Sequence, residues 1–403
     1  MANIKQLKHL EHLEDEMLNY GVDGCIAAVS FLEELKKMLG HQENSGFMQT
    51  KWDGAPAVVC GIHPKIGQFF VGTKSVFNKT DRKICYGHHD IDLYYGSRQD
   101  LAEKLHVALN MFAGLGIEGV IQGDLLFTRK DVKTENVHGE RLYTFRPNTI
   151  TYGIPVDHEI GKRVGKAEIG VVFHTSYKGD RLSTMQAVGG VSVKSFAPMP
   201  EVVVVENDTP MHKVGLNHQE EVKFDKHVSD IEKMCGTCGD FLDELVAKKG
   251  TTGDDKWHIA SYVKQFFNAE IKAARTINNV DTALEGLYNF YYDKTKAMLS
   301  KLKTTNTKVA KASLVHSSLN YLEHNKPKFK AMLHLYKELQ ETKQFVIDKL
   351  DHLESFRTYV QTDKGYKVTS PEGYVLHKDG DMIKFVNRLE FAYNNFTLQK
   401  QWR

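Results

Sequence analysis

Residues 48–61 read MQTKWDGAPAVVCG, and at this stretch the pattern of the chain changes. The sequence before it has helical spacing, whereas short apolar runs typical of strands follow it. Lys51 and Asp53 lie just ahead of the first such run. On an extended backbone they share one face and Trp52 takes the other, so Asp53 is placed to orient the lysine amine or to hold a metal. A plain β-turn with a solvated lysine is the alternative.

On the N-terminal side of this stretch, the spacing of leucines predicts two helices over residues 5–40, separated by GVDG at 21–24. On its C-terminal side, residues 48–205 contain apolar runs separated by turn residues, which predict strands. One helix interrupts them, opened by Ser97 and closed by Gly114 and Gly116.

Residues 217–357 turn helical, and the end of the chain returns to strands. Asp379-Gly380 lies between two apolar runs and predicts a hairpin. The sequence therefore predicts an α+β protein in which a large helical insertion divides a strand-rich domain. The expected segments are N-terminal helices packed on the catalytic domain at 1–47, the first part of that domain at 48–215, the helical insertion at 216–357, and the last part of the domain at 358–403.

The composition excludes several classes of protein. The 53 basic and 51 acidic residues give a formal net charge of +2, so a nucleic-acid surface has to come from local charge segregation. The N-terminus lacks the apolar core of a signal peptide, and no apolar run is long enough to span a membrane. Five cysteines with no disulfide framework favour a reducing compartment. We expect a cytoplasmic protein, in the host cytoplasm if viral, with no membrane contact and no obligate protein partner.

Two short motifs look like metal sites. Cys235 and Cys238 form a CxxC, but no second ligand pair has suitable spacing, so structural cysteines are favoured. The CYGHHD stretch brings together Cys85, His88 and His89, for which an ordinary polar loop is favoured over a metal site.

The chemistry expected at Lys51 is nucleophilic. A lysine amine attacks only when it is deprotonated and held still. Trp52 beside it would partly desolvate the amine and lower its pKa, and Gly54 would let the backbone approach a phosphate or base closely.

Several motifs that follow one another along the chain favour a nucleophilic Lys51 over a solvated lysine in a plain β-turn. KWDG at 51–54 resembles the first motif of the covalent nucleotidyltransferases, which are the DNA ligases, RNA ligases and mRNA capping enzymes. FFVGTKSVF at 69–77, IQGDLLF at 121–127, EIGVVFHTSY at 168–177, SPEGYVLHKDG at 370–380 and DMIKFVNR at 381–388 are similar to the later motifs. The resemblance covers 48 to about 205 and 365–390.

The resemblance implies an antiparallel-sheet, ATP-grasp-like nucleotidyltransferase domain and a role for each matched residue. Lys51 would form a covalent lysyl–AMP intermediate, with Asp53 and Lys384 as its catalytic partners. Asp124 and Glu372 would hold Mg²⁺ or Mn²⁺, and Phe173 would stack on the purine. The residues implied to bind ATP are Thr50, Trp52, Gly54, Lys74, Asp124, Phe173, Glu372 and Lys384. Cationic side chains and Mg²⁺ suit the charge that develops on phosphate oxygens.

The chain departs from the family pattern at three positions. Pro56 stands where an arginine is common, Asp124 where glutamate is usual, and Met382 where a further lysine is expected, so Arg388 or Lys378 would compensate. Only residues 385–403 follow Lys384, which leaves no room for an oligonucleotide-binding barrel. A standard DNA ligase or capping enzyme is therefore disfavoured. The chain looks most like RNA-ligase-like proteins of large tailed bacteriophages.

The helical insertion contains a basic segment. Residues 289–337 hold ten lysines and two acidic residues, a local charge of +8, with tyrosines interleaved. Such a pattern favours phosphate tracking and base stacking, with a solvated helix face as the alternative. The residues expected to contact nucleic acid are Lys301, Lys303, Lys308 and Lys311.

The sequence therefore predicts an ATP-dependent polynucleotide ligase whose partner is RNA, or less readily a nicked duplex. Two other interpretations stay open. One keeps nucleotidyl transfer but changes the acceptor to a protein or small molecule. The other is a nucleotide- or nucleic-acid-binding module without catalysis, which the three departures would explain.

Overall fold

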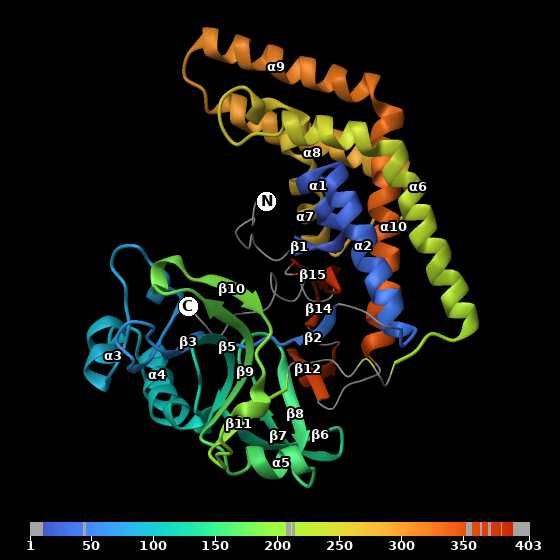
Figure 1. The fold of residues 1–403 in the computed structure, drawn as a ribbon. Helices are drawn as coiled ribbons and strands as arrows, with labels where there is room; N and C mark the ends of the chain where they lie inside the picture. Colours follow the sequence, from blue (N-terminus) through green and yellow to red (C-terminus); the bar gives the residue numbers. More distant parts are fainter. Residues whose placement is uncertain are drawn as a thin grey trace.

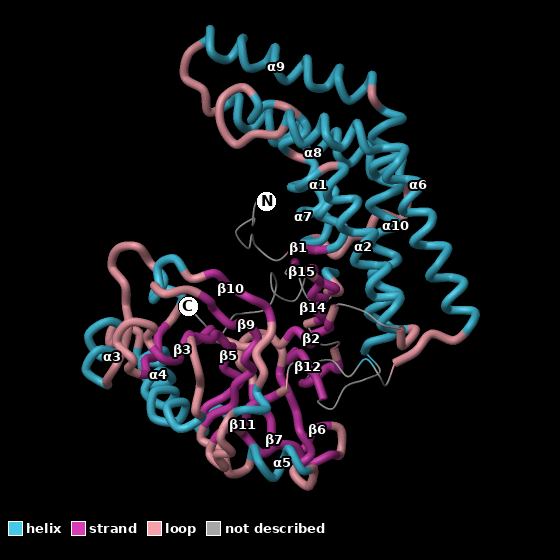
Figure 2. Tube along the Cα trace, viewed as in Figure 1, coloured by secondary structure: helices cyan, strands magenta, loops and turns pink. Residues whose placement is uncertain are grey.

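The computed structural model describes most of the chain, namely residues 11–42, 46–206, 211, 214–351, 357–362, 365–369, 372–379 and 381–389. The start of the helix expected from residue 5 and Gly380 of the expected hairpin lie outside these residues. Within them the chain is an α+β protein with three sheets, mostly antiparallel, and one long helical segment between the eleventh and twelfth strands (Figures 1 and 2).

Sheet A lies at the centre of the molecule, between the helices and the other strands (Figure 1). Its strand order is β1-β15-β14-β2. Both ends of the chain contribute to it, because β1 pairs with β15 in parallel and β14 pairs with β2 and β15 in antiparallel fashion. Its strands are β1 (Glu11–His12), β2 (Phe47–Lys51), β14 (Gly373–Lys378) and β15 (Asp381–Phe385).

Sheet B has the order β10-β9-β5-β3-β4, with β11 also paired to β9. Helices α3 (His88–Tyr95) and α4 (Gln99–Phe112) cover one face and share a buried apolar core with it. The strands are β3 (Ala57–Ile62), β4 (Phe69–Gly72), β5 (Val120–Thr128), β9 (Ile169–Lys178), β10 (Gln186–Gly189) and β11 (Val202–Val205).

Sheet C has the order β13-β12-β8-β7-β6 and is antiparallel throughout. The short helix α5 (Glu159–Val164) packs beside β7 and β8. The strands are β6 (Lys133–Val137), β7 (Glu140–Phe145), β8 (Thr151–Pro155), β12 (Arg357–Thr362) and β13 (Gly365–Val368). Sheet C therefore joins strands from before and after the helical segment, as expected if that segment is an insertion.

The helices form a second region beside sheet A. Asn217 caps the first helix of the long segment, with its side chain accepting from the Glu220 backbone N–H and the Glu220 carboxylate accepting from the Asn217 backbone N–H. The helices are α1 (Glu16–Tyr20), α2 (Val22–Leu39), α6 (His218–Lys248), α7 (Val263–Lys272), α8 (Val280–Ser300), α9 (Thr305–His324) and α10 (Lys326–Leu350). Short 3-10 helices cover Leu13–Asp15 (η1), Lys74–Phe77 (η2), Ala113–Leu115, Arg129–Asp131, Leu182–Thr184, Val193–Ser195, Asp255–Trp257 and Ile259–Ser261.

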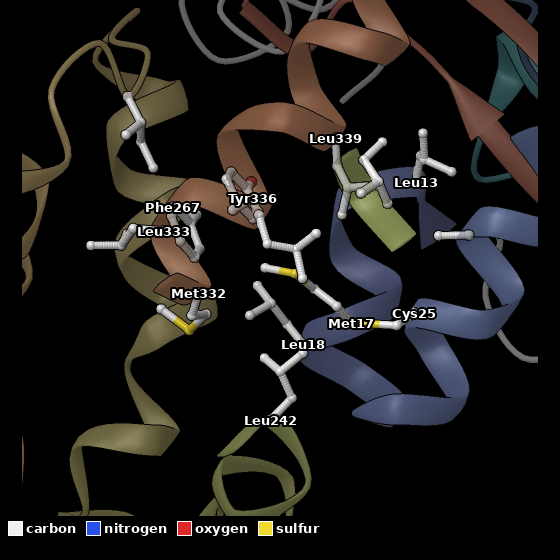
Figure 3. Packing of buried hydrophobic residues seen from close by; sticks show 14 of the residues in the cluster. Leu13, Met17, Leu18, Cys25, Leu242, Phe267, Met332, Leu333, Tyr336 and Leu339 are labelled. Carbon is white, nitrogen blue, oxygen red and sulfur yellow. The ribbon is translucent and has the colours of Figure 1, made fainter. Parts of the chain in front are cut away.

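The N-terminal helices pack against the helical insertion as well as against sheet A, which belongs to the strand-rich part on which they were expected to pack. Met17 and Leu18 of α1 and Cys25 of α2 share a buried core with Leu242 of α6 and Leu339 of α10 (Figure 3). The same core reaches one face of sheet A. The expected helical pattern over 5–40 also missed the Glu11–His12 strand, because two residues are too few to give a periodic signal.

No helix in the described part of the chain is both long enough and apolar enough to cross a membrane.

Candidate active site

The stretch around Lys51 is the connection between two sheets. Strand β2 ends at Lys51 in sheet A, and β3 begins at Ala57 in sheet B. Gly54 lies against β5, because a side-chain carbon at this position would come within 2.6 Å of the Asp124 Cβ. The Ala55 N–H donates to the Leu125 carbonyl over 2.9 Å. Gly54 is thus required for close packing on β5, a different reason from the phosphate approach predicted above.

The two faces of sheet A differ in chemistry. Paired residues on neighbouring strands project from the same face, and successive residues alternate. Met48, Leu376 and Ile383 lie on the face that packs against the helical core. The opposite face carries a row of polar side chains, and the register assigns to it His12, Gln49, Lys51, His377 and Lys384.

Lys51 and Glu372 form an ion pair on this side of sheet A. The Lys51 ammonium donates to the Glu372 Oε1, although the two residues are 321 positions apart in sequence. Gly373 pairs directly with Lys51, so no side chain stands between them. Their side chains are 27% and 10% exposed, respectively.

The electrostatics of the pair keep the proton on Lys51. Burial lowers the pKa of Lys51, but the Glu372 carboxylate, together with the charges of Asp124 and Asp53, outweighs burial and holds it above its usual value. Burial raises the pKa of Glu372 to about 7, against the opposing effect of Lys51. A lowered lysine pKa was expected from Trp52 alone, and the structure reverses the direction because the carboxylate is closer.

Asp124 approaches the same group from sheet B. Its negative charge contributes to the raised pKa values of both Lys51 and Glu372. His174 on β9 lies beside it, with Nε2 3.5 Å from the Asp124 Oδ2. The structure therefore brings together Lys51, Glu372 and Asp124, which the sequence placed in three separate motifs.

Asp53, predicted to act beside Lys51, is held by a set of hydrogen bonds. Its carboxylate accepts from the Asn148 side chain at 2.7 Å and from the backbone N–H groups of Thr149 and Ile150 at 2.7 and 2.8 Å. Its own N–H donates to the Tyr152 hydroxyl. These donors attach the connection between β2 and β3 to the segment before β8. The charge of Asp53 also acts on Lys51 and Glu372.

Three residues predicted to bind ATP face away from Lys51. Thr50 alternates with Lys51 and lies on the helix-facing side of sheet A. Trp52 is 9% exposed and packs with Tyr152 at a ring-centroid distance of 5.1 Å. Phe173 is fully buried between Phe112 and Phe196. The predicted purine stacking on Phe173 is therefore wrong for this structure, since the ring has no exposed face.

The two lysines predicted to contact phosphate groups lie in different parts of the structure. Lys384 lies on the polar face of sheet A and interacts electrostatically with Lys51 and Glu372. Lys74 is exposed in η2 and forms no hydrogen bond or ion pair within the described residues. The structure does not bring Lys74 to Lys51.

Neither residue expected to compensate for Met382 is available for that purpose. The Arg388 guanidinium donates to Asp15 at 2.9 Å and to Glu14 at 3.2 Å. Lys378 points to the helix side of sheet A, where its ammonium donates to Ser30.

Asp124 and Glu372 offer the kind of donors that Mg²⁺ prefers. Both supply carboxylate oxygens, and a site with two carboxylates leaves the remaining positions to water and phosphate. The structure describes no group of three or more histidine, cysteine and acidic residues suited to a metal ion. The residues present thus fit Mg²⁺ that binds together with a nucleotide, and fit a preformed all-protein site poorly.

The lysines expected to contact nucleic acid lie at the outer end of the helical region. Lys301 follows α8, Lys303 precedes α9 and Lys308 lies on α9; all three are exposed. Lys311 instead pairs with Asp254 and lies 6.0 Å from the Trp257 ring. Figure 1 shows α9 at the edge of the molecule, with α8 between it and the strands.

The two metal-like motifs are occupied by local contacts. The CxxC lies on α6, where Cys238 is buried and Cys235 interacts with Cys25 of α2. The His88 Nδ1 lies 2.6 Å from the Nδ1 of His106, and its Nε2 lies 2.9 Å from the Asn110 side-chain oxygen. Cys85 is buried in the core beneath β4.

No motif in the sequence pointed to the histidines near the candidate site. His174 and Phe173 occupy opposite faces of β9, but both faces carry apolar side chains in its first half, so alternation alone did not single out His174. His12 gave no signal, since it lies on a two-residue strand at the edge of sheet A.

Comparison with known proteins identifies a family but no activity. Residues 3–400 match a family of unknown function, DUF6267, and the chain belongs to this family. Comparison with curated proteins and with solved structures found no match.

Proposed function

We propose that this protein is a covalent nucleotidyltransferase with an ATP-grasp-like catalytic domain, and that Lys51 is its nucleophile. The observation that carries the proposal is the meeting of Lys51, Glu372, Asp124 and Lys384 on facing sheets. They come from motifs spread over more than 330 residues of sequence, since Lys51 and Lys384 alone span that interval. Random resemblance of short motifs gives no reason for such convergence.

The pair of Lys51 and Glu372 supports the first chemical step. Glu372, with a pKa near 7, accepts a proton from the Lys51 ammonium. The freed lone pair attacks the α-phosphorus of ATP; the N–P bond forms as the bond to the bridging oxygen breaks, and pyrophosphate leaves with that electron pair. Lys384 stabilises charge on the phosphate oxygens. Mg²⁺ held by the Asp124 carboxylate would supply further neutralisation of these oxygens, while Glu372 takes the Lys51 proton.

For the acceptor, we favour the 5′-phosphate of a polynucleotide, and RNA over DNA. The exposed lysines at 301, 303 and 308 support this choice, because unpaired cations bind phosphate backbones. Their position at the far end of the helical region supports the second candidate, a nucleotidyltransferase with a protein or small-molecule acceptor.

A label-and-chase experiment tests the activity and separates the acceptors. The full chain is incubated with Mg²⁺ and α-labelled ATP, freed of nucleotide, and then mixed with 5′-phosphorylated RNA or DNA. We expect a label on the protein that moves to RNA and, more slowly, to DNA. γ-Labelled ATP serves as a control and should leave the protein unlabelled. A protein that takes no label from α-labelled ATP or GTP would contradict the proposal.

The contribution of the lysines is tested with matched charge reversals. Lys303→Glu with Lys308→Glu should weaken RNA binding and reduce the slope of log affinity against log salt by about 1.4, or about 0.7 per contact. The control reverses Lys226 and Lys233 on α6, whose side chains are 80% and 75% exposed. Equal effects of the two pairs would remove the assignment of this surface to RNA and favour the other acceptors.

A further inference from the structure

His12 lies next to Lys384 in an unusual position for a histidine. It occupies β1, the edge strand of sheet A, and its backbone is paired in parallel with Lys384. Paired residues share a face, so the imidazole projects from the same face as Lys384 and Lys51. The imidazole thus belongs to the polar face on which the proposed reaction occurs.

The imidazole has an unmet hydrogen-bonding group. Its Nδ1 is shielded from solvent and has no hydrogen-bond partner among the described residues. Burial lowers the pKa of His12 well below its usual value, and the charges of Arg388, Lys343, Lys384 and Lys51 act in the same direction. A buried polar atom without a partner is costly, which makes it a candidate contact for a ligand.

The charges around His12 indicate the sign of that ligand. Glu14 and Asp15 neutralise Arg388, and Glu14 also holds Lys343 at 2.6 Å. Lys384, in contrast, forms no hydrogen bond or ion pair within the part of the chain that the structure describes. The charges of Glu372 and Glu11 act on Lys384 against those of Lys51 and Arg388, but neither carboxylate forms an ion pair with it within the described residues. An imidazole beside this ammonium is suited to an anion with several oxygen acceptors.

The order of strands indicates which anion. Sheet A runs β1-β15-β14-β2, so His12 is three strands from Lys51, on the far side of Lys384. With strands about 4.8 Å apart, the backbones of β1 and β2 are separated by roughly 14 Å. Lys51 has to meet the α-phosphate, which leaves the outer phosphates to extend along the face toward β1.

We propose that His12, together with Lys384, forms the subsite for the β- and γ-phosphates of the nucleotide, and hence for the pyrophosphate that leaves. The inference rests on the proposed function for its role in the reaction. The imidazole N–H donates to an oxygen of the outer phosphates, both before the N–P bond forms and after the bond to pyrophosphate breaks. No proton has to be transferred by His12 in this role.

Binding of three probes to the full chain tests the subsite. Calorimetry is used with ATP, AMP and inorganic pyrophosphate, each with Mg²⁺. We expect His12→Ala to weaken ATP and pyrophosphate about tenfold or more, as for a lost hydrogen bond to a charged group. AMP affinity should stay within about twofold. The His12→Asn variant keeps a short side-chain donor and should recover part of the loss.

Comparing ATP with AMP separates the loss of a phosphate contact from a general effect of the substitution on the structure. If His12→Ala weakens AMP and ATP equally, or weakens neither, the subsite is contradicted. If His12→Ala fails to fold, the same comparison in His12→Asn decides, with His12→Gln as the variant of different reach. Unchanged pyrophosphate affinity in all folded variants also overturns the inference.

A kinetic readout separates this inference from the proposed function. Pyrophosphate should reverse the labelling of Lys51, and His12→Ala should slow that reversal about tenfold at low pyrophosphate. If Lys51 takes label and every His12 variant reverses like the parent, only the subsite fails. If Lys51 takes no label but pyrophosphate binding still depends on His12, the subsite stands and nucleotidyl transfer fails.

Discussion

The Lys51–Glu372 pair explains how a lysine with a raised pKa can still act as a nucleophile. The carboxylate that stabilises the ammonium is itself near half-protonation at neutral pH, because burial raises its pKa to about 7. Proton transfer from Lys51 to Glu372 is still uphill, because the pKa of Lys51 lies above its usual value and that of Glu372 is about 7. The raised pKa nevertheless makes Glu372 a better proton acceptor than an ordinary carboxylate. The sequence supplied both residue identities through the motifs, but not their ion pair, which depends on the register between β2 and β14.

The pH dependence of labelling tests this pair. Glu372 accepts a proton only when ionised, so the labelling rate should rise as the pH increases through about 7. In Glu372→Gln the rise near pH 7 should disappear and the rate should fall roughly 100-fold or more. Single-turnover labelling between pH 5.5 and 9 measures both effects. A Gln variant that keeps the parent's rate and profile would rule out Glu372 as the proton acceptor.

His377 should make the stability of the protein depend on pH. Burial lowers its pKa from 6.5 to about 4, and its ring stacks on Phe47 at 4.3 Å. Between pH 4 and 6.5 the folded state binds fewer protons than the unfolded state. Stability is therefore full above pH 6.5 and falls as the pH drops toward 4, by about 3 kcal/mol.

The His377→Phe variant keeps the stacking and removes the titration. Its unfolding free energy, measured by denaturant titration, should lose less between pH 6.5 and 4 than that of the parent. His316→Asn on the exposed part of α9 is the control and should follow the parent curve. Parallel curves for His377→Phe and the parent would show that another group controls the acid sensitivity.

Strand β9 shows where sequence patterns succeed and where they fail. Its ten residues were predicted as a strand, and the structure confirms the element over Ile169–Lys178. The pattern could not tell which face packs on α4, because both faces of β9 carry apolar side chains in its first half. The family resemblance assigned Phe173 to the nucleotide, and this pattern could not show that the ring belongs to the core.

Substitutions at two neighbouring positions of β9 test this reassignment. Phe173→Ala should cost about 3–5 kcal/mol of unfolding free energy, as for a fully buried ring. It should leave nucleotide affinity unchanged in the folded protein. His174→Ala, on the face with Asp124, should do the opposite and change nucleotide affinity with little loss of stability. Melting temperature and ATP affinity are measured for both variants. If Phe173→Ala weakens ATP binding and His174→Ala does not, the assignment is refuted.

A buried ion network holds together the segments around the candidate site. Lys343 of α10 pairs with Glu14 of η1, and Arg388 pairs with Glu14 and Asp15. The network thus joins the N-terminal segment, the helical insertion and the last motif. None of these pairings was visible in the sequence, because the partners are separated by hundreds of residues and each looks like an ordinary charged position.

Breaking the network should destabilise the whole molecule. Lys343→Met leaves Glu14 buried with less compensation and should cost about 3–5 kcal/mol. The double variant Glu14→Gln with Lys343→Met removes both charges and should cost less than the sum of the two single variants. Lys226→Met on exposed α6 is the control and should change stability by about 0.5 kcal/mol or less. Additive costs in a denaturant titration would contradict the coupling.

The division of the whole chain into a strand-rich part and a helical insertion was predictable from hydrophobic periodicity. The attachment of α1 and α2 to the insertion was not, since amphipathic spacing shows that a helix has an apolar face but not which partner covers it. Sheet A uses both ends of the chain, and this closure is what brings Lys51 to Glu372 and Lys384.

The most direct test of the account is the mass of the protein after incubation with ATP and Mg²⁺. Intact-protein mass spectrometry should show a gain equal to one nucleoside monophosphate, and peptide mapping should assign it to Lys51. Lys51→Arg keeps the positive charge beside Glu372 and should show no gain, while retaining the parent's melting temperature within a few degrees. A gain that persists in Lys51→Arg, or that maps to another residue, would contradict the account, as would a parent protein that gains no mass with either ATP or GTP.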